Sequence, residues 1–298
     1  MQRNGNQLNA LAMDNLTYHY AMDANGNKIN NRLLHVNDAV LDSDYIMDID
    51  NQEEFNYSYD KIGNLIEDKQ EEIAEIIWTA SGKIAEIRRE QGSEKSDLLF
   101  KYDAFGNRVS KTVIYPTVMP DGVKELATYY VRDAQGNVMA TYEEKRYDDA
   151  TPTTLALTEQ YLYGSSRLGV RKAQSDETYY ELTNHLGNVM AVVSSEKNTD
   201  GTAKVVALND YYPFGMQQPG RIFERNSYRY GFQNQEIEKE ITGNASHSFF
   251  KYRISDNRLG RFFSVDPLFA EYPWNSSYTF SENRLLDGIE LEGLEFFD

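Results

Sequence analysis

Polar and apolar positions alternate along much of the chain, and the alternation is interrupted by short turns that carry glycine. The segment 100–109, "FKYDAFGNRV", has aromatic residues, then Asp, a two-residue gap, Gly-Asn and an aliphatic residue. Similar segments occur at 18–29, 57–66, 129–139 and 179–190. Period-two alternation beside a recurring turn signal predicts antiparallel β-hairpins.

The residue types of the turn explain why it bends the chain. Glycine adopts positive φ without steric cost and asparagine tolerates it better than most residues, so Gly-Asn is expected to turn the backbone. The preceding Asp or Asn is expected to cap backbone N–H groups of the turn. On the outgoing strands, alternation predicts two sets of residues that each share one face: Val138, Ala140 and Tyr142, and Val189, Ala191 and Val193.

The hairpins are expected to join one another. A single hairpin cannot bury its apolar face, so consecutive copies should fuse into a continuous sheet. A weaker copy lies at 78–84. The segment 71–80 contains helix formers, but it lies between two repeat turns, so its β-branched and Trp end is assigned to a strand. The segment 234–241 is the best candidate for a short helix, and 143–158 and 194–204 resemble insertion loops.

Composition and charge exclude several functions. The formal net charge is −17, from 47 acidic and 30 basic residues, which repels phosphate backbones and anionic lipid. We therefore expect no nucleic-acid partner and no membrane insertion. The chain has no cysteine, its four histidines show no ligand spacing, and no phosphate-binding loop is present, so neither a metal nor a cofactor is expected. No apolar run reaches the roughly 18 residues of a membrane span, and residues 1–20 do not have the pattern of a signal peptide.

Several segments of the C-terminal half carry a family resemblance. The stretch "YYELTNHLGNVMAVVS" at 179–194 is followed by "YYPFGMQQPGR" at 211–221, "YRYGFQNQE" at 228–236, and 252–295. Together with the hairpin repeats, they resemble the YD repeats of the Rhs proteins, which also occur in Tc-toxin C components and in teneurins. The last segment resembles the Rhs repeat-associated core domain.

The resemblance implies an all-β fold. Residues 1–210 are then a continuous coiling antiparallel sheet of YD-repeat hairpins, forming part of a shell. Residues 211–298 are the core domain, which closes the shell as a plug with little helix. The implied partners are a C-terminal toxin passenger and further YD-repeat shell, together with a secretion apparatus and an immunity protein. The implied location is outside the cell or on its surface, by a route other than Sec, or the cytoplasm before export.

The family's core domain also implies a site for self-cleavage. Its first acid matches Asp266, although the glycine that ends the family's motif is missing here. The second acid is Glu290, with Asp287 as the competing assignment, and Arg261 matches an arginine that precedes the first motif. The resemblance implies a cut beside Leu294, the residue that follows Gly293.

Two carboxyl groups held close together can hydrolyse a peptide bond, because their pKa values move apart and supply a base and an acid. An adjacent arginine can stabilise the tetrahedral oxyanion. Asp-Pro, Asp-Gly and Glu-Gly are also ordinary turn dipeptides, and glutamate in place of aspartate moves the carboxylate by one methylene. An inactive structural plug therefore stays open as the alternative, and whether the chain is an enzyme is left undecided.

The ends of the sequence leave further alternatives. The chain begins with Met within repeat-like sequence, and only "EFFD" follows Leu294. It is therefore expected to be a fragment, an orphaned gene end, or a chain close to its own cleavage point. About twelve strands would not close a shell, so exposed edges and self-association are expected. Other roles are a non-enzymatic surface or carbohydrate-binding module, or a hydrolase that acts on outside substrates.

Overall fold

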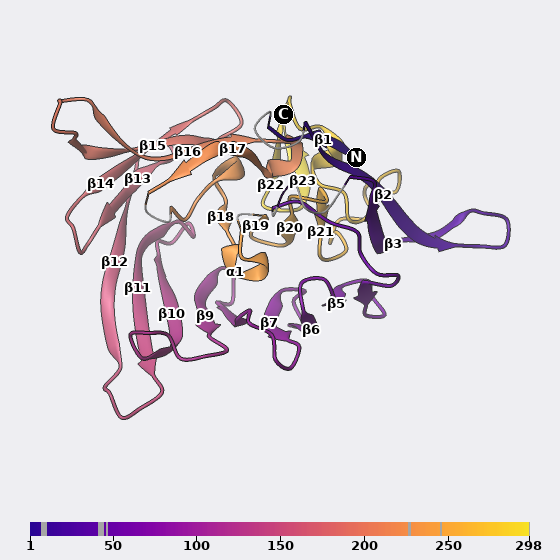
Figure 1. The fold of residues 1–298 in the computed structure, drawn as a ribbon, viewed down its shortest axis with the longest axis horizontal. Helices are drawn as coiled ribbons and strands as arrows, with labels where there is room; N and C mark the ends of the chain where they lie inside the picture. Colours follow the sequence, from indigo (N-terminus) through magenta and orange to yellow (C-terminus); the bar gives the residue numbers. More distant parts are fainter. Residues whose placement is uncertain (7–10, 41–44, 46, 226–227, 245, 298) are drawn as a thin grey trace.

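A computed structural model describes residues 1–6, 11–40, 45, 47–225, 228–244 and 246–297. Its dominant feature is a 14-stranded antiparallel sheet, β4 to β17, in which every strand pairs with its neighbours in the sequence. The sheet curves around the C-terminal segment, which carries α1 and β18–β21 (Figure 1). The described residues thus form an all-β structure with little helix, as the repeats predict. None of their helices has the length and apolar character needed to cross a membrane.

Strand bounds follow the predicted hairpins. The long sheet consists of β4 (Tyr57–Tyr59), β5 (Leu65–Asp68), β6 (Ile73–Trp78), β7 (Ile84–Arg89), β8 (Asp97–Tyr102), β9 (Arg108–Ile114), β10 (Val123–Arg132), β11 (Val138–Tyr147), β12 (Thr154–Tyr163), β13 (Arg167–Lys172), β14 (Thr178–Thr183), β15 (Val189–Lys197), β16 (Ala203–Tyr211) and β17 (Gln217–Glu224). Smaller sheets contain β1 (Gln2–Asn4), β2 (Ala12–Met22) and β3 (Lys28–Asp38); β18 (Glu236–Ile237), β19 (His247–Phe249), β20 (Ile254–Asp256) and β21 (Arg261–Phe262); and β22 (Ile289–Leu291) and β23 (Glu295–Phe297). The helical elements are η1 (Pro213–Gly215), η2 (Phe232–Asn234), α1 (Lys239–Thr242) and η3 (Ser281–Asn283).

Three local predictions can be compared with the structure, and two of them change. The strand expected before Trp78 is present as β6. The segments 143–158 and 194–204 are not insertion loops, because most of their residues extend the hairpins β11–β12 and β15–β16. The helix expected over 234–241 is limited to the four residues of α1, because Glu236 and Ile237 form β18 instead.

The turns confirm the predicted capping role of aspartate. The Asp103 carboxylate accepts hydrogen bonds from the backbone N–H of Phe105 at 2.9 Å and of Asn107 at 2.8 Å. Gly106 has a φ of 78°, which glycine adopts without strain. Asn107 does not adopt positive φ, contrary to expectation. Its side-chain amide donates to the Asp103 carboxylate at 3.0 Å, so asparagine contributes through its side chain.

Replacing Asp103 with alanine is expected to lower the free energy of unfolding by about 1–2 kcal/mol, because two backbone N–H groups and the Asn107 amide lose their acceptor. Urea unfolding measures the change. The matched control is Phe105→Ser at the tip of the same turn, where the side chain is 83% exposed and little change is expected. Equal losses in the two variants would contradict the capping role.

A recurring β-bulge changes which residues face inward. In six hairpins the outgoing strand has one unpaired residue shortly after the turn, as where Arg132 pairs with Val138 and Val131 pairs with Ala140. Because the extra residue reverses the alternation, Val138 shares its face with Thr141. The predicted shared face of Val138 with Ala140, and that of Val189 with Ala191, is therefore wrong. Bulges also bend and twist a strand, which suits a sheet that coils.

The two ends of the long sheet are bridged by the sheet β1–β3 (Figure 1). The Tyr212 hydroxyl donates to the Asn4 carbonyl near β17, and the backbone N–H of Val36 in β3 donates to the Gln52 side chain, shortly before β4, at 2.8 Å. Within the described residues, the outer edges of β4 and β17 pair with no further strand. The edges expected to be open are thus connected to the sheet β1–β3 by side-chain hydrogen bonds and by the Gln52 N–H, which donates to the Val36 carbonyl at 3.0 Å. Self-association stays a prediction.

The core lies between the concave face of the sheet and the C-terminal segment. One apolar cluster joins β2–β9 to residues that include Ile241 and Leu259, and a second joins β10–β16 to Tyr228 and Tyr230. The C-terminal segment therefore supplies the second layer that a one-sided sheet needs. The division at residue 210 into a shell and a core domain stays a prediction.

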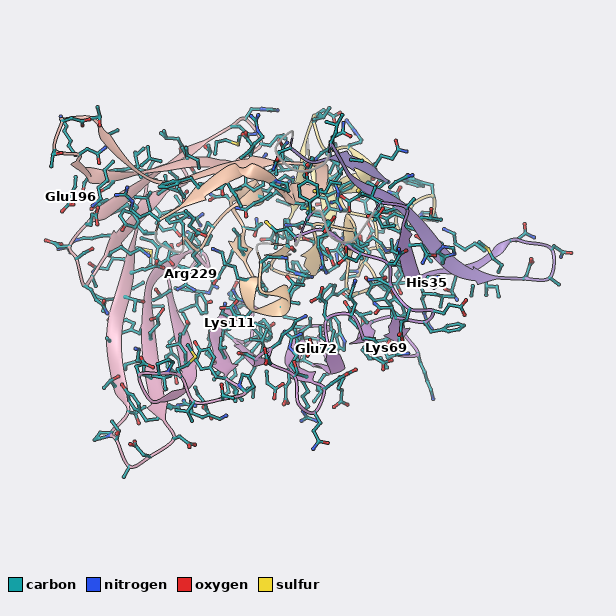
Figure 2. The ribbon with its side chains drawn as sticks, in the orientation of Figure 1. His35, Lys69, Glu72, Lys111, Glu196 and Arg229 are labelled. Atoms are coloured by element: carbon teal, nitrogen blue, oxygen red, sulfur yellow. The ribbon has the colours of Figure 1, made fainter. Side chains whose placement is uncertain are left out.

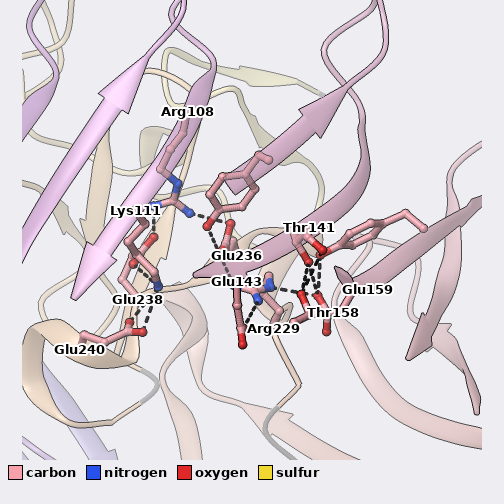
Figure 3. A network of polar contacts seen from close by, with 12 residues as sticks. Arg108, Lys111, Thr141, Glu143, Thr158, Glu159, Arg229, Glu236, Glu238 and Glu240 are labelled. Atoms are coloured by element: carbon pink, nitrogen blue, oxygen red, sulfur yellow. Dashed lines mark hydrogen bonds and ion pairs between the residues drawn. The ribbon is translucent and has the colours of Figure 1, made fainter. Parts of the chain in front are cut away.

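Charged side chains cross the same interface (Figures 2 and 3). Arg108 of β9 pairs with Glu236 at 2.5 Å and also with Glu238. Lys111 pairs with Glu238 at 3.2 Å and with Glu240 at 3.0 Å. These pairs fix the C-terminal segment against β9 in one position.

Candidate active site around Arg253

Two left-handed turns frame the candidate site. Gln233 and Asn234 have φ values of 46° and 59°, and Ser281, Glu282 and Asn283 have values of 48°, 49° and 62°. Each such residue costs roughly 1–3 kcal/mol, so the surrounding structure must hold it in place. The residues before these turns, Phe232 and Phe280, pack together with two further phenylalanines in a buried cluster that supplies this support.

Glu290 of β22 lies between the two turns. Its backbone N–H donates to the Gln233 side-chain oxygen at 3.0 Å, and its carboxylate accepts the Ser281 N–H at 2.5 Å. The side chain is buried. Burial raises the pKa of Glu290 to about 7, and the nearby Asp266 adds to this, against the opposing effects of Arg253 and the Ser281 N–H. Glu290 is thus a carboxyl group that can exchange its proton near neutral pH.

Arg253 connects the two predicted acids. Its Nη2 lies 3.0 Å from an Asp266 carboxylate oxygen and 3.4 Å from a Glu290 carboxylate oxygen. Its Nε donates to the Gly293 carbonyl. Its Nη1 is buried and has no hydrogen-bond partner among the described residues. One guanidinium therefore contacts both acids and the backbone at the expected cleavage point.

A small cavity of ≈20 Å³ lies beside these groups and is lined by Asp266, Glu290 and Leu294, among others. One water molecule needs about 10–15 Å³ measured in this way. Asp266 is the more accessible acid, with a side chain that is 15% exposed, whereas that of Glu290 is 1% exposed. The cavity therefore has room for one water next to two carboxyl groups that differ in environment.

The structure brings some of the predicted site residues together and not others. Asp266, Glu290, Gly293 and Leu294 meet around Arg253. Asp287, the competing assignment for the second acid, pairs with Arg284 at 2.6 Å on the surface.

Arg261 contacts neither acid and instead donates to the Tyr20 hydroxyl at 3.1 Å and the Asn31 carbonyl at 2.6 Å. Arg253 was not among the residues predicted from the sequence. In the sequence, Arg253 lies between Tyr252 and Ile254, at the start of a strand. The alternation of polar and apolar residues there does not reveal that its guanidinium is buried.

One further group of acids lies close together. Carboxylate oxygens of Asp14, Asp38 and Asp48 are within 4.8 Å of one another. Asp14 is already paired with the buried Arg3 at 2.8 Å. A cluster of acids is common without an ion, and it assigns no metal here.

Comparisons with curated proteins place the chain among very long relatives. No family model matches it. It is 28% identical over 247 residues to Salivary gland surface protein 1 of Aedes aegypti and 27% identical over 215 residues to tRNA nuclease WapA of Bacillus subtilis. These matches cover 81% and 70% of this chain but only 7% and 8% of the relatives. The chain therefore corresponds to a small part of each.

Solved structures share its fold. A structure of the Tc holotoxin pore of Photorhabdus luminescens is similar to 94% of this chain, with a TM-score of 0.60 and 14% identity. The similar part is 13% of the chain in that structure. The TcdB2-TccC3 crystal structure matches 74% of this chain and 10% of that chain, with a TM-score of 0.57 and 15% identity. The repeated hairpins and the C-terminal segment inside the curve of the sheet thus form a fold that these Tc toxin structures share. The resemblance to the Rhs/YD-repeat proteins is supported by this shared fold and by the homology to WapA.

Proposed function

We propose that this chain is the C-terminal part of the shell of an Rhs-type polymorphic toxin, which encloses a toxin passenger. The observation that carries the proposal is the single curved sheet that surrounds its own C-terminal segment (Figure 1). The name of one relative, a tRNA nuclease, supports a toxic activity elsewhere in such long chains. Secretion or display at the cell surface, further YD-repeat shell, a secretion apparatus and an immunity protein belong to the same proposal.

We also propose that the site around Arg253 cleaves the chain once, at a peptide bond beside Leu294. Asp266 takes a proton from water, and the hydroxide attacks the carbonyl carbon. The Gly293 carbonyl accepts a hydrogen bond from Arg253. This hydrogen bond polarises the carbonyl, which favours cleavage at the Gly293–Leu294 peptide bond. Glu290, in its protonated form, gives its proton to the leaving amide nitrogen as the C–N bond breaks. The products are a carboxyl group and an amine, and Asp266 ends protonated.

The test is a chain extended beyond Asp298 by a reporter domain. The unsubstituted extended chain is expected to give two fragments, with a new N-terminus at Leu294 or Glu295 identified by mass spectrometry. Asp266→Asn is expected to slow cleavage at least 100-fold, because the base is lost. The matched control, Asp287→Asn, removes a surface acid and should cut normally. An unsubstituted chain that stays as intact as Asp266→Asn would contradict the protease and leave the shell proposal standing.

A further inference from the structure

A second cavity, of ≈270 Å³, lies away from the two acids, under the turns of the hairpins β8–β9 and β10–β11. Its walls come from these turns, from the β12–β13 hairpin and from the C-terminal segment. The cavity is lined by charged residues of both signs, which are the cations Arg108, Arg132, Arg167 and Lys251 and the anions Glu236 and Glu292. The excess of cations is notable because the chain as a whole has a net charge of −17.

Arg132 differs from the other cations of this lining, because Arg108, Arg167 and Lys251 pair with Glu236, Glu181 and Glu292. Its Nε donates to the Arg108 carbonyl at 3.0 Å, and its Nη1 donates to the Gly136 carbonyl at 2.6 Å. Among the described residues, no carboxylate forms an ion pair with it. Burial and the neighbouring Arg108 charge lower the pKa of Arg132. The neutral carbonyls hold the guanidinium in place but leave its positive charge directed at the cavity.

Two further cations lie next to Arg132, of which Arg108 is already paired with Glu236 and Glu238. The Nε of Arg108 is buried and has no hydrogen-bond partner in the described part of the chain. Lys83 packs against Gly106 at the cavity wall and donates to the Lys251 carbonyl, again without a carboxylate partner in the described ranges. Burial and the Lys251 charge lower the pKa of Lys83 to about 8.

Other buried arginines have more acceptors: Arg89, which also has no carboxylate partner, donates to four backbone carbonyls, whereas Arg132 donates to two and its Nη2 has no acceptor among the described residues. Arg3 pairs with Asp14 at 2.8 Å, and Arg258 pairs with Glu71 at 2.6 Å. A buried or half-buried cation normally has such a partner, because leaving it unpaired in a low-dielectric environment is costly. The unpaired charge beside a cavity therefore indicates that an anion can complete the site.

We propose that this cavity binds an oxyanion, the carboxylate or phosphate group of a ligand, with Arg132 as its main contact. A guanidinium presents a planar fork of donors that matches both groups in a bidentate geometry. One water molecule needs about 10–15 Å³ measured in this way, so the cavity of ≈270 Å³ has room for an anionic group and for a larger part of the ligand that carries it. This site uses neither Asp266 nor Glu290, and it stands whether or not the chain cleaves itself.

The test follows the melting temperature of the chain by thermal unfolding and anion binding by isothermal titration calorimetry. Inorganic phosphate and succinate are tested separately, and sodium chloride keeps the ionic strength equal. One of the two anions is expected to raise the melting temperature and to bind with a measurable Kd. Stronger binding of phosphate would assign a phosphoryl ligand, and stronger binding of succinate a carboxylate. If neither stabilises the chain more than chloride does, the proposal is wrong.

Variants locate the binding. Arg132→Gln is expected to weaken anion binding at least tenfold, because it removes both the charge and the fork. Arg132→Lys keeps the positive charge and replaces Arg132→Gln in the test if that variant does not fold. It should also weaken binding, because the planar fork of donors of the guanidinium is lost. The matched control is Arg171→Gln, which removes an exposed arginine paired with Asp176 and should leave the Kd unchanged. Binding that is equal in the Arg132 variants and the control would overturn the assignment.

Discussion

Replacing Arg108 with methionine is expected to lower the free energy of unfolding by about 3–5 kcal/mol. The Arg108 side chain is completely buried and forms ion pairs with Glu236 and Glu238, which are also buried (Figure 3). Methionine fills much of the same volume but leaves both carboxylates without their shared partner. When one member of a buried charge group is removed, the remaining charges stay buried without the partner that offset their desolvation, which is unfavourable.

Other cations in this network reduce the loss without cancelling it. Arg229 lies 3.1 Å from Glu236, and Lys111 lies 3.2 Å from Glu238. Each carboxylate therefore keeps one positive neighbour in the variant, which is why the expected loss is not larger. Burial raises the pKa of a carboxyl group that loses its partner, so the variant should lose more stability at neutral than at acidic pH.

Urea unfolding followed by tyrosine and tryptophan fluorescence measures this effect. The matched control is Arg171→Met, where an exposed arginine pairs with Asp176, and a change of less than about 0.5 kcal/mol is expected. Hydrogen exchange should show the C-terminal segment opening first, because Arg108 joins β9 to that segment. A loss for Arg108→Met no greater than for the control would contradict a role of the charge network in holding the segment.

The Glu290→Gln variant is expected to gain about 3 kcal/mol of stability relative to the unsubstituted chain when the pH is raised from about 4.5 to about 8. The pKa of Glu290 is about 7 in the folded protein, compared with an ordinary value of 4.5. Below the ordinary value, both folded and unfolded chains are protonated at this residue, so the protonated form contributes its full stability. As the pH rises towards about 7, the unfolded chain loses its proton first and the folded state becomes less favourable.

Glutamine has no proton to lose, so its contribution does not change over this range. The measurement is the difference between the two unfolding free energies at each pH, which removes the effect of other titrating groups. The control is Glu90→Gln, which removes the charge of an exposed glutamate, and the pH-dependent difference is expected to be larger for Glu290→Gln than for this control. A constant difference for Glu290→Gln across the range would show that this carboxyl group titrates normally, and it would weaken its proposed role as the acid.

Much of the site could not be predicted from the sequence. Arg253 and Arg261 are eight positions apart, and both precede Asp266 in the chain. Which arginine reaches the acid depends on the path of the strands between them, and that path is fixed by packing around Phe262 and its neighbours. In the same way, Glu290 and Asp287 are close in sequence, but only Glu290 lies between the two left-handed turns.

The sequence by itself determined the hairpins, because each turn is made by contacts within five residues: Asp103 caps N–H groups up to Asn107, and Gly106 supplies the positive φ. It also determined the all-β class and the order of the strands, since short turns join neighbours in the chain. Only the tertiary structure decided which residues face inward, because a bulge reverses the alternation after the turn. It also decided how the sheet closes and which charges meet, since those contacts join residues more than 100 positions apart, such as Arg108 and Glu236.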